Sequence, residues 1–319
     1  MGHRIKSKKI LITGGAGFIA SHLLERLIDD NKVTIYDNLL RNAFQYTRLK
    51  RHPNLTFIKG DVLDFESLNA AMKGVNICVH AAAIAGIFSV GKKATLTMKV
   101  NFIGAYHALE AAVNNKVKRF IDFSTSEVYG PFVYRGKETD STTLGPVGEK
   151  RWVYAISKLA GEHFAHTYGE EYGLETITVR PFNIYGPRQV GEGAIQQMTS
   201  RALRNEDITV FNEGTQIRSW CYVTDFVDAL YNTLHVKDAG NHVFNIGNPQ
   251  ATITVLRLAE RIISMTKSES KIVFKAHPGP EVEMRVPDIN KARSLLKFEP
   301  KVSLEEGLRK SIIWYQKHT

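Results

Sequence analysis

The chain has few cysteines. Only two, Cys78 and Cys221, occur among its 319 residues, and each stands alone in the sequence. Two isolated cysteines fit reduced thiols in a core better than a disulfide framework or a metal site. We therefore predict no disulfide and no bound metal.

Long apolar runs and clustered basic charge are also missing. No apolar run has the length of a membrane-spanning helix, so we predict no membrane partner. The N-terminal stretch MGHRIKSKK contains no apolar signal core, which predicts a cytoplasmic protein. The formal net charge is +10, but Lys and Arg are scattered and no motif of basic and aromatic residues occurs. We predict no nucleic-acid partner; the basic surface is compatible with a phosphorylated small substrate.

What remains is the composition of an ordinary globular protein, with 43% hydrophobic and 23% charged residues. Through the first half, short segments rich in Val, Ile, Phe and Thr alternate with segments of helical spacing. This alternation predicts an α/β fold with a Rossmann-type, doubly wound parallel sheet. The predicted strands of the first half are residues 9–13, 32–37, 55–61, 75–83, 119–125 and 175–181.

A glycine-rich turn follows the first predicted strand, in ILITGGAGFIASHLLERL. Gly14, Gly17 and Ala20 have the spacing of a dinucleotide-binding turn, which brings backbone and a helix N-terminus close to a pyrophosphate. Asp37 follows Gly17 by 20 residues, at the end of the next strand, where the ribose hydroxyls are expected. A carboxylate there repels a 2′-phosphate, so we predict NAD as the cofactor. Arg41 is the one nearby residue that would suit NADP instead.

Two further segments carry groups that can move a proton. YAISK places Tyr154 and Lys158 four residues apart on a helix, hence on one face. An ammonium near the phenol is expected to lower the pKa of Tyr154 and so favour its use as a base. FSTSEVYG places Thr125, Ser126 and Glu127 directly after a predicted buried strand. This row is either a polar turn at the edge of the sheet or part of a catalytic site.

Taken together, these segments resemble an extended short-chain dehydrogenase/reductase of the nucleotide-sugar epimerase/dehydratase family. The resemblance runs nearly end to end, through TGGAGFIASH, YDN, GDVLD, HAAA, VNFIGAYHALEAA, FSTSEVYG, YAISK, RPFNIYGPRQ, IRSWCYVTD and VFNIGN. Two departures stand out. Ala20 replaces the third glycine, and Trp152-Val153 replaces the usual Ser-Pro, so that RWVYAISK is similar to nucleotide-sugar acid decarboxylases.

The resemblance implies roles for individual residues. Tyr154 would take the proton of the substrate's 4-hydroxyl, Lys158 would bind the nicotinamide ribose, and Thr125 would hydrogen-bond the 4-hydroxyl. The implied catalytic set is Thr125, Ser126, Glu127, Tyr154 and Lys158. The implied NAD site is Gly14, Gly17, Phe18, Ile19, Asp37, Asn38, Asp61, Val62, Ala81, Ala82, Asn101, Tyr154 and Lys158. The implied nucleotide-sugar site is Ala85, Thr125, Asn183, Arg188, Arg218 and Arg285, with the diphosphate on Asn183, Arg218 and Arg285.

The resemblance also implies the organisation of the chain. We expect residues 1–181 to form the NAD-binding domain, which also takes back 219–248. Residues 182–218 and 249–319 would form a smaller C-terminal α/β part that binds the nucleotide sugar. The apolar faces of helices 93–115 and 152–172 imply a homodimer.

The reaction stays open at this level. Enzymes of this kind oxidise the sugar to a 4-ketone, and a plain epimerase needs little beyond Thr125 and Tyr154. Glu127 therefore favours an NDP-hexose 4,6-dehydratase, with an NDP-hexuronic acid decarboxylase and an NDP-sugar 4-epimerase as alternatives. Glu127 could also be a structural carboxylate. An alternative of another class is a non-catalytic dinucleotide sensor, which the fold alone would permit.

Overall fold

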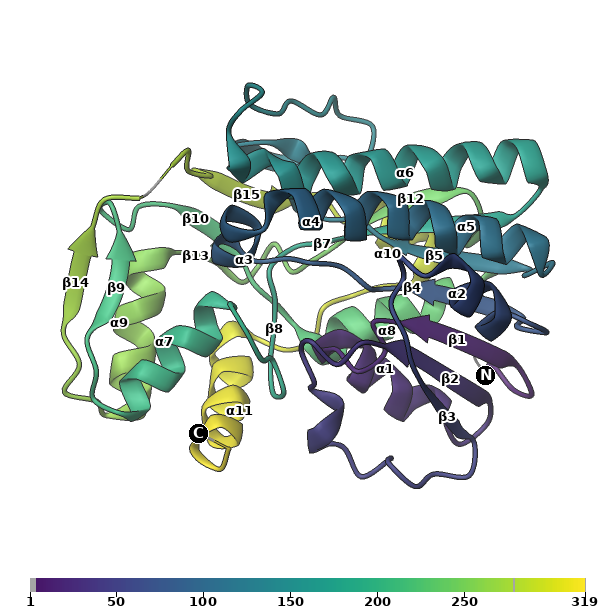
Figure 1. Ribbon diagram of the computed structural model, residues 1–319. Helices are drawn as coiled ribbons and strands as arrows, with labels where there is room; N and C mark the ends of the chain where they lie inside the picture. Colours follow the sequence, from purple (N-terminus) through teal and green to yellow (C-terminus); the bar gives the residue numbers. More distant parts are fainter. Residues whose placement is uncertain (1–3, 278, 319) are drawn as a thin grey trace.

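A seven-stranded parallel sheet forms the centre of the computed structural model, which describes residues 4–277 and 279–318 (Figure 1). The strand order is β12-β7-β5-β4-β1-β2-β3, so the chain winds outward in both directions from its first strand. The strands are β1 (Lys9–Thr13), β2 (Lys32–Asp37), β3 (Leu55–Lys59), β4 (Ile77–His80), β5 (Arg119–Phe123), β7 (Glu175–Pro181) and β12 (His242–Ile246). The predicted doubly wound, Rossmann-type sheet is confirmed.

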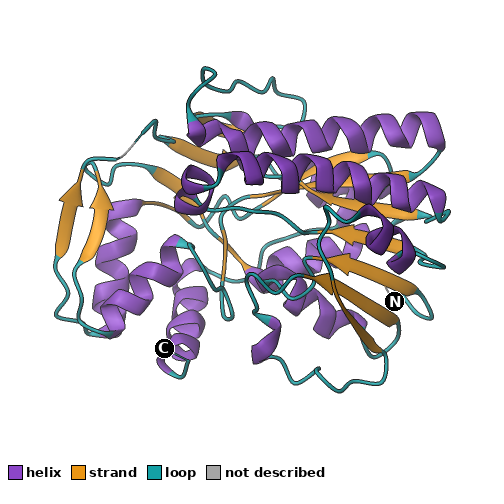
Figure 2. Ribbon diagram, in the orientation of Figure 1, coloured by secondary structure: helices purple, strands orange, loops and turns teal. Residues whose placement is uncertain are grey.

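Helices cover both faces of this sheet (Figure 2). One face carries α1 (Phe18–Leu27) and α8 (Val223–Thr233), and the other carries α2 (Phe65–Ala71), α5 (Gly104–Asn114) and α6 (Val153–Tyr172). Each face has its own cluster of buried apolar side chains, as expected when helices cover a parallel sheet on both sides.

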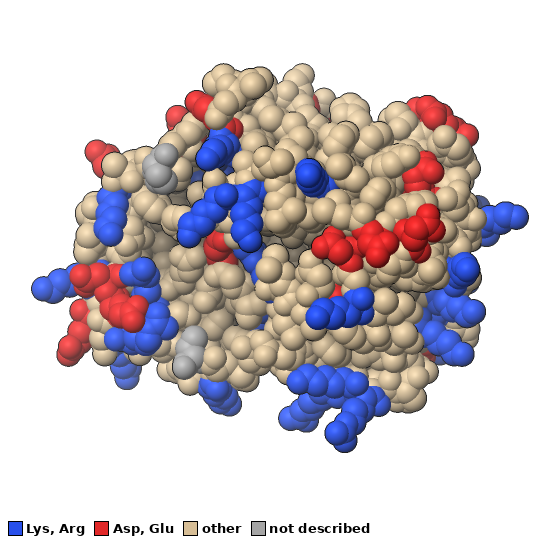
Figure 3. Space-filling view, viewed as in Figure 1, with Lys and Arg blue, Asp and Glu red and all other residues tan. Residues whose placement is uncertain are grey.

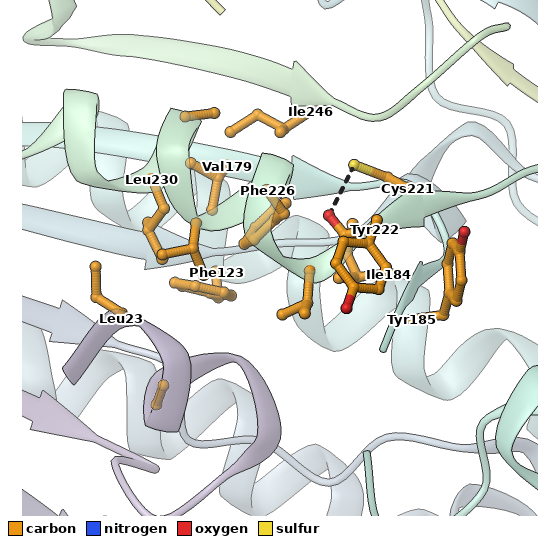
Figure 4. Packing of buried hydrophobic residues seen from close by; sticks show 14 of the residues in the cluster. Leu23, Phe123, Val179, Ile184, Tyr185, Cys221, Tyr222, Phe226, Leu230 and Ile246 are labelled. Atoms are coloured by element: carbon orange, nitrogen blue, oxygen red, sulfur yellow. Dashed lines mark hydrogen bonds between the residues drawn. The ribbon is translucent and has the colours of Figure 1, made fainter. Parts of the chain in front are cut away.

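The larger of the two clusters extends from the sheet into the C-terminal part (Figure 4). Leu23 of α1 and Phe226 of α8 pack with Phe123 of β5, and the cluster continues to Cys221 and Tyr222. Both cysteines are buried free thiols, as predicted. This shared core ties the smaller part of the molecule to the carboxyl ends of the strands.

The smaller part contains a four-stranded sheet in the order β13-β10-β15-β6 and two strand pairs, β11-β8 and β14-β9. Its strands are β6 (Phe132–Gly136), β8 (Ile184–Tyr185), β9 (Ile208–Phe211), β10 (Ile217–Ser219), β11 (Cys221–Tyr222), β13 (Thr252–Thr254), β14 (Ile272–Lys275) and β15 (Met284–Pro287). Its helices are α7 (Ala194–Leu203), α9 (Val255–Thr266), α10 (Asn290–Leu296) and α11 (Leu304–Gln316). Because β6 comes from the first 181 residues and β12 lies in the large sheet, the chain passes repeatedly between the two parts.

Short helices occupy the loops at the carboxyl edge of the large sheet. They are α3 (Ile87–Lys92), α4 (Ala94–Met98), the π-helical turn η2 (Lys99–Ile103) and the 3₁₀ turns η1 (Phe44–Tyr46), η3 (Ser126–Tyr129) and η4 (Lys150–Trp152). The helix expected over 93–115 is thus divided by a π turn. The 3₁₀ turn η5 (Lys237–Ala239) leads into β12 and so lies at the opposite, amino edge. Within the described part of the chain, no helix has both the length and the apolar character needed to cross a membrane.

Candidate active site

The turn between β1 and α1 requires glycine at its first position. Gly14 has a φ of +66°, and a Cβ atom built there would lie 2.7 Å from the backbone nitrogen of Ala82. A side chain at position 14 is therefore excluded by the positive φ angle and by the backbone that follows the neighbouring strand β4. Gly17 is the N-cap of α1, so Phe18 and Ile19 begin a helix whose first N–H groups have no intrahelical acceptor. This geometry suits a pyrophosphate.

Asp37 is held firmly at the end of β2 beside this turn. Its carboxylate accepts the backbone N–H of Ala16 at 3.0 Å and that of Leu39 at 2.6 Å. Burial raises the pKa of Asp37. Arg41 turns away from it and donates to the carbonyl of Ala85 at 2.8 Å and to Glu192 at 3.3 Å. Arg41, the residue that would have suited NADP, is thus bound to Ala85 and Glu192 and not to the region around Asp37. The residues present at the turn fit NAD.

Asn38, Asp61 and Val62 continue the same edge of the sheet. The carboxylate of Asp61 accepts the N–H of Leu63 at 3.0 Å, and its backbone carbonyl accepts the Tyr36 hydroxyl at 3.0 Å. Asn38 and Asp61 are exposed, whereas Val62 is buried. The structure therefore brings these three residues of the implied NAD site together at one edge of the sheet.

Asn101 lies beneath the loop that follows β4. Its side-chain oxygen accepts the N–H of Ile84 at 2.8 Å, and its amide donates to the carbonyl of Ile84 at 3.0 Å and to Ser157 at 3.1 Å. Above it, the N–H of Ala81 donates to the carbonyl of Thr13 at 3.1 Å. Asn101 is fully buried, so it supports this loop, which contains Ala81, Ala82 and Ala85, from below.

Tyr154 and Lys158 lie on α6 beside Thr125, which caps the η3 turn. Thr125 interacts through its hydroxyl with Tyr154 and accepts the N–H of Glu127 at 3.1 Å. Burial raises the pKa of Tyr154 to about 12, and the Thr125 hydrogen bond only partly opposes this rise. The expected lowering of the Tyr154 pKa by Lys158 is therefore not found in the chain without ligands. Desolvation of the phenolate outweighs the effect of the nearby charges.

Glu127 lies between two arginines at the same place. Its carboxylate contacts the guanidinium of Arg285 on one side and lies 2.6 Å from Nη2 of Arg151 on the other. Although burial opposes it, the attraction of Arg285 and Arg151 lowers the pKa of Glu127 to about 2. Glu127 is therefore a fixed anion at neutral pH. Ser126, the preceding residue, is buried in the η3 turn.

The residues expected to bind the substrate divide into two groups. Arg218 and Arg285 are cross-strand neighbours on β10 and β15, and burial together with the charge of Arg285 lowers the pKa of Arg218 to about 10. Asn183 donates to the carbonyl of Ser219 at 2.9 Å, which places it next to this strand pair. Arg188 behaves differently: it forms two hydrogen bonds to Glu25 of α1, at 2.8 and 2.7 Å. Its guanidinium is therefore bound to the carboxylate of Glu25 on α1.

A cavity of about 580 Å³ lies beside Glu127 and Tyr154, the two sequence-predicted site residues in its lining. Its lining consists of Gly86, Ile87, Phe88, Val90, Gly91, Lys92, Glu127, Gly148, Glu149, Lys150, Arg151, Tyr154, His277, Gly279 and Pro280. The helix α3 forms its apolar wall, and Tyr154 with Glu127 forms its polar wall. The space-filling view shows basic and acidic side chains spread over the surface around the hollow between the two parts (Figure 3).

Sequence reasoning missed several of these residues. Arg151 lies within RWVYAISK but carries no motif of its own, and the wall around His277 is far away in the sequence. Glu192 accepts the N–H groups of Phe88 at 2.8 Å and Ser89 at 3.1 Å, and so anchors α3. Nothing in the local sequence around Glu192 indicates this contact.

Several proteins that this chain is similar to are named for reactions on nucleotide sugars. A family described as "NAD dependent epimerase/dehydratase family" matches residues 10–247. A UDP-N-acetyl-alpha-D-glucosaminuronate decarboxylase of Bacillus cytotoxicus is 35% identical over 97% of this chain and 98% of its own. A dTDP-D-glucose 4,6-dehydratase of Homo sapiens is 32% identical, covering 98% and 91%. The structure of UDP-glucuronic acid 4-epimerase from Bacillus cereus, in complex with UDP-glucuronic acid and NAD, has a TM-score of 0.89 at 29% identity, covering 98% and 100%.

Proposed function

The chain belongs to the NAD-dependent epimerase/dehydratase family and is an NAD-dependent enzyme that modifies a nucleotide sugar, and from this premise we propose that it decarboxylates a UDP-hexuronic acid. The observation that carries the proposal is the position of Glu127 between Arg151 and Arg285, next to Tyr154 in the cavity. Two guanidinium groups contact one carboxylate, which leaves one positive charge in excess. Arg285, which the sequence had assigned to the diphosphate, is buried against Glu127 and the Gly130 carbonyl, so Arg151 is the arginine of this pair that lines the cavity. A second carboxylate, on C5 of the sugar, suits this excess charge; a neutral hexose does not need it.

The low pKa of Glu127 also supports decarboxylation over dehydration. Dehydration needs a base that removes the C5 proton, and a carboxylate with a pKa of about 2 is a poor base at neutral pH. Loss of carbon dioxide from a 4-keto acid needs no base at C5, because the electron pair comes from the breaking C5–C6 bond. The relative from Bacillus cytotoxicus, whose name states such a decarboxylation, agrees with this choice.

The residues of the chain would divide the work as follows. The glycine turn at Gly14 and Gly17, with Asp37, would hold NAD, which would supply the acceptor and later the donor of the C4 hydride. Tyr154 takes the proton of the 4-hydroxyl, which Thr125 orients, and Lys158 holds the nicotinamide ribose. The C5–C6 bond then breaks, its electron pair moves onto the C4 oxygen, and carbon dioxide leaves. C5 takes one proton from solvent, because Glu127 is ionised, and Tyr154 returns its proton to the C4 oxygen.

The experiment is mass spectrometry of the products formed from UDP-glucuronic acid, UDP-N-acetylglucosaminuronic acid, UDP-glucose and dTDP-glucose. Loss of carbon dioxide from an acid supports the proposal, and Tyr154→Phe is the matched control that should form no product. Conversion of an acid to its 4-epimer with unchanged mass would contradict it.

A second candidate is the 4,6-dehydratase that the sequence favoured. Its support is that Glu127 and Tyr154 line one cavity, and that the human relative is named as such an enzyme. Loss of water from dTDP-glucose or UDP-glucose would favour it. The non-catalytic sensor is not retained, because the chain belongs to a family of enzymes.

We also propose a homodimer. Helices α4 to α6 leave Leu96, Ile103, Tyr106, Ile156 and Tyr172 exposed. An apolar face of this kind on two adjacent helices suits association with a second copy. Light scattering coupled to size-exclusion chromatography tests it, and a monomer at micromolar concentration would contradict it. The cytoplasmic location stays a prediction.

A further inference from the structure

Arg180 is a buried arginine near the carboxyl end of β7, and it is hydrogen-bonded to two elements of the candidate active site. Its Nε and Nη2 atoms donate to the carboxylate of Glu162 on α6, at 2.9 and 2.7 Å. Its Nη1 atom donates to the hydroxyl of Tyr129, at the end of the η3 turn, at 2.8 Å. One side chain therefore joins the helix that carries Tyr154 to the turn that Thr125 caps.

Glu162 fixes the position of α6 on the sheet. Tyr154, Lys158 and Glu162 follow one another at four-residue intervals, so they lie on one side of the helix. Besides the two hydrogen bonds from Arg180, the Glu162 carboxylate accepts one from the hydroxyl of Ser124, directly after β5. These bonds hold α6 against the ends of β5 and β7, and Tyr154 lies two turns away on the same helix, a rise of about 12 Å.

Tyr129 fixes the η3 turn in a similar way. Arg180 on β7 and Asn245 on β12 are neighbours across the two strands, and the Tyr129 hydroxyl lies 2.8 Å from a polar side-chain atom of each. The Cζ atom of Arg180 also lies 4.9 Å from the centroid of the Tyr129 ring, over its face. Because Tyr129 ends the short turn that begins after Thr125, the position of its buried hydroxyl determines how that turn lies on the sheet.

The three residues of this connection do not touch the cavity directly. Among the described residues that line it, Arg180, Glu162 and Tyr129 are absent, and all three are buried. A buried ion pair often adds little net stability, because the removal of two charges from water costs about as much as their attraction returns. Fully hydrogen-bonded buried groups do, however, make the elements that they join rigid. The connection is therefore suited to hold geometry.

We propose that Arg180 is a positioning residue that acts through Glu162 and Tyr129. It sets the position of Tyr154 on α6 relative to Thr125 at the start of the η3 turn. The inference rests on the proposed function only in the roles that it gives to Tyr154 and Thr125, and it holds whichever reaction follows the oxidation of C4. Tyr154 can take the 4-hydroxyl proton only when both groups reach the same oxygen, and a displacement of about 1 Å can lower the rate by about a hundredfold. A looser connection should therefore slow the chemical step and leave binding nearly unchanged.

The test is Tyr129→Phe, which keeps the ring and removes only the hydroxyl that Arg180 binds. The rate of a single turnover, the KM of the nucleotide sugar that the parent converts and the affinity for NAD are measured. We expect the single-turnover rate to fall about tenfold, with KM and NAD affinity within about twofold of the parent. Tyr231→Phe is the matched control, because Tyr231 is also buried, its hydroxyl accepts the N–H of Ile5 at 3.0 Å, and Arg26 lies over its ring at 4.8 Å. The control should keep the parental rate although it also loses a buried hydrogen bond.

Arg180→Lys provides a second comparison, also if Tyr129→Phe does not fold. It keeps a positive charge beside Glu162, but an ammonium cannot reproduce the planar fork that reaches Tyr129 as well, so the same loss of rate is expected. A single-turnover rate of Tyr129→Phe within about twofold of the parent, an equal loss in Tyr231→Phe, or a loss confined to KM would overturn the inference. The mass of the parent's product tests the decarboxylation, whereas the ratio of the two rates tests Arg180, so either can fail without the other.

Discussion

Arg285 holds the carboxylate of Glu127 although the two residues are 158 positions apart in the sequence. Arg285 comes from β15 in the smaller part, and Glu127 follows β5 of the large sheet. Arg285 also donates to the carbonyl of Gly130 at 2.7 Å, so one buried guanidinium fixes both the charge and the backbone of the η3 turn. The ion pair thus joins the two parts of the molecule at the cavity.

The ion pair of Glu127 with Arg285 should make the free energy of unfolding depend on pH in the acid range. The pKa of Glu127 is about 2 in the folded chain and about 4.5 without neighbours, so its contribution is complete above pH 4.5 and is lost as the pH falls toward 2. The difference corresponds to about 3 kcal/mol. Urea unfolding of the parent should show this loss, and Glu127→Gln should be less stable at neutral pH but lack the dependence. Glu171→Gln, at an exposed position, is the control. Equal acid profiles for Glu127→Gln and parent would contradict the assignment.

Arg151 should discriminate acid substrates from neutral ones. Arg151→Met removes one of the two positive charges near Glu127, so kcat/KM for a UDP-hexuronic acid should fall about tenfold or more. Binding of UDP alone, which has no sugar carboxylate, should change little. Steady-state kinetics and calorimetry measure the two effects, and Arg151→Lys should recover part of the loss. A parallel fall in UDP affinity would mean that Arg151 serves the nucleotide instead.

Replacement of the base should separate chemistry from binding. Tyr154→Phe keeps the ring in the cavity but removes the hydroxyl that takes the proton, so turnover should fall by about two to four orders of magnitude. In the parent, where the pKa of Tyr154 is about 12 without ligands, kcat/KM should rise with pH as the phenol of the free enzyme loses its proton. NAD affinity of the variant should stay within a few-fold of the parent. Substantial turnover by Tyr154→Phe would refute the role of Tyr154.

Two glycines with the same φ angle offer a matched test of the cofactor turn. Gly14 and Gly173 both have a φ of +66°, but a Cβ atom at Gly173 meets nothing within 4 Å. Gly173→Ala should therefore lower the free energy of unfolding only by the penalty of a left-handed alanine, about 1 to 2 kcal/mol. Gly14→Ala should cost more and should abolish NAD binding, because its Cβ strikes Ala82. Thermal unfolding and NAD titration distinguish the two, and normal NAD affinity in Gly14→Ala would be inconsistent with the proposed turn.

Glu192 should control the apolar wall of the cavity. Its carboxylate binds the first N–H groups of α3, the Ser89 hydroxyl and Arg41. Glu192→Ala should let α3 move, raise KM for the nucleotide sugar several-fold and affect kcat less. The position of α3 in a crystal structure of the variant would check the cause. Unchanged KM would show that α3 stays in place without this anchor.

Short-range patterns predicted the sheet and the core of the site. The turn at Gly14, the acid at Asp37 and the pair of Tyr154 and Lys158 each depend on spacing within one or two elements, and spacing is visible in a sequence. Local spacing also accounts for two helix starts, where the side chains of the N-caps Thr254 and Ser303 accept the N–H groups of Arg257 and Glu306.

Contacts between distant segments could not be predicted in this way. Arg188 carries the same charge as Arg218, and only the fold shows that Glu25 engages the first of them. The anchoring of Glu192 and the ion pair of Arg151 with Glu127 likewise depend on how separate loops meet above the sheet. The pKa of Tyr154 was misjudged because the sequence shows the neighbouring charge of Lys158 but not the burial of the phenol.

The π-helical turn that contains Asn101 has a consequence for insertions and deletions. A π turn holds one residue more than an α-helical turn, which rotates everything before it by about 100° relative to everything after it. The extra residue therefore sets the phase between α4 and α5. Deletion of one residue within 99–103 would restore a continuous α-helix but turn Asn101 away from Ile84 or shift the Tyr106 side chain around the helix. This stretch should accept point substitutions on its outer side far more readily than any change in its length.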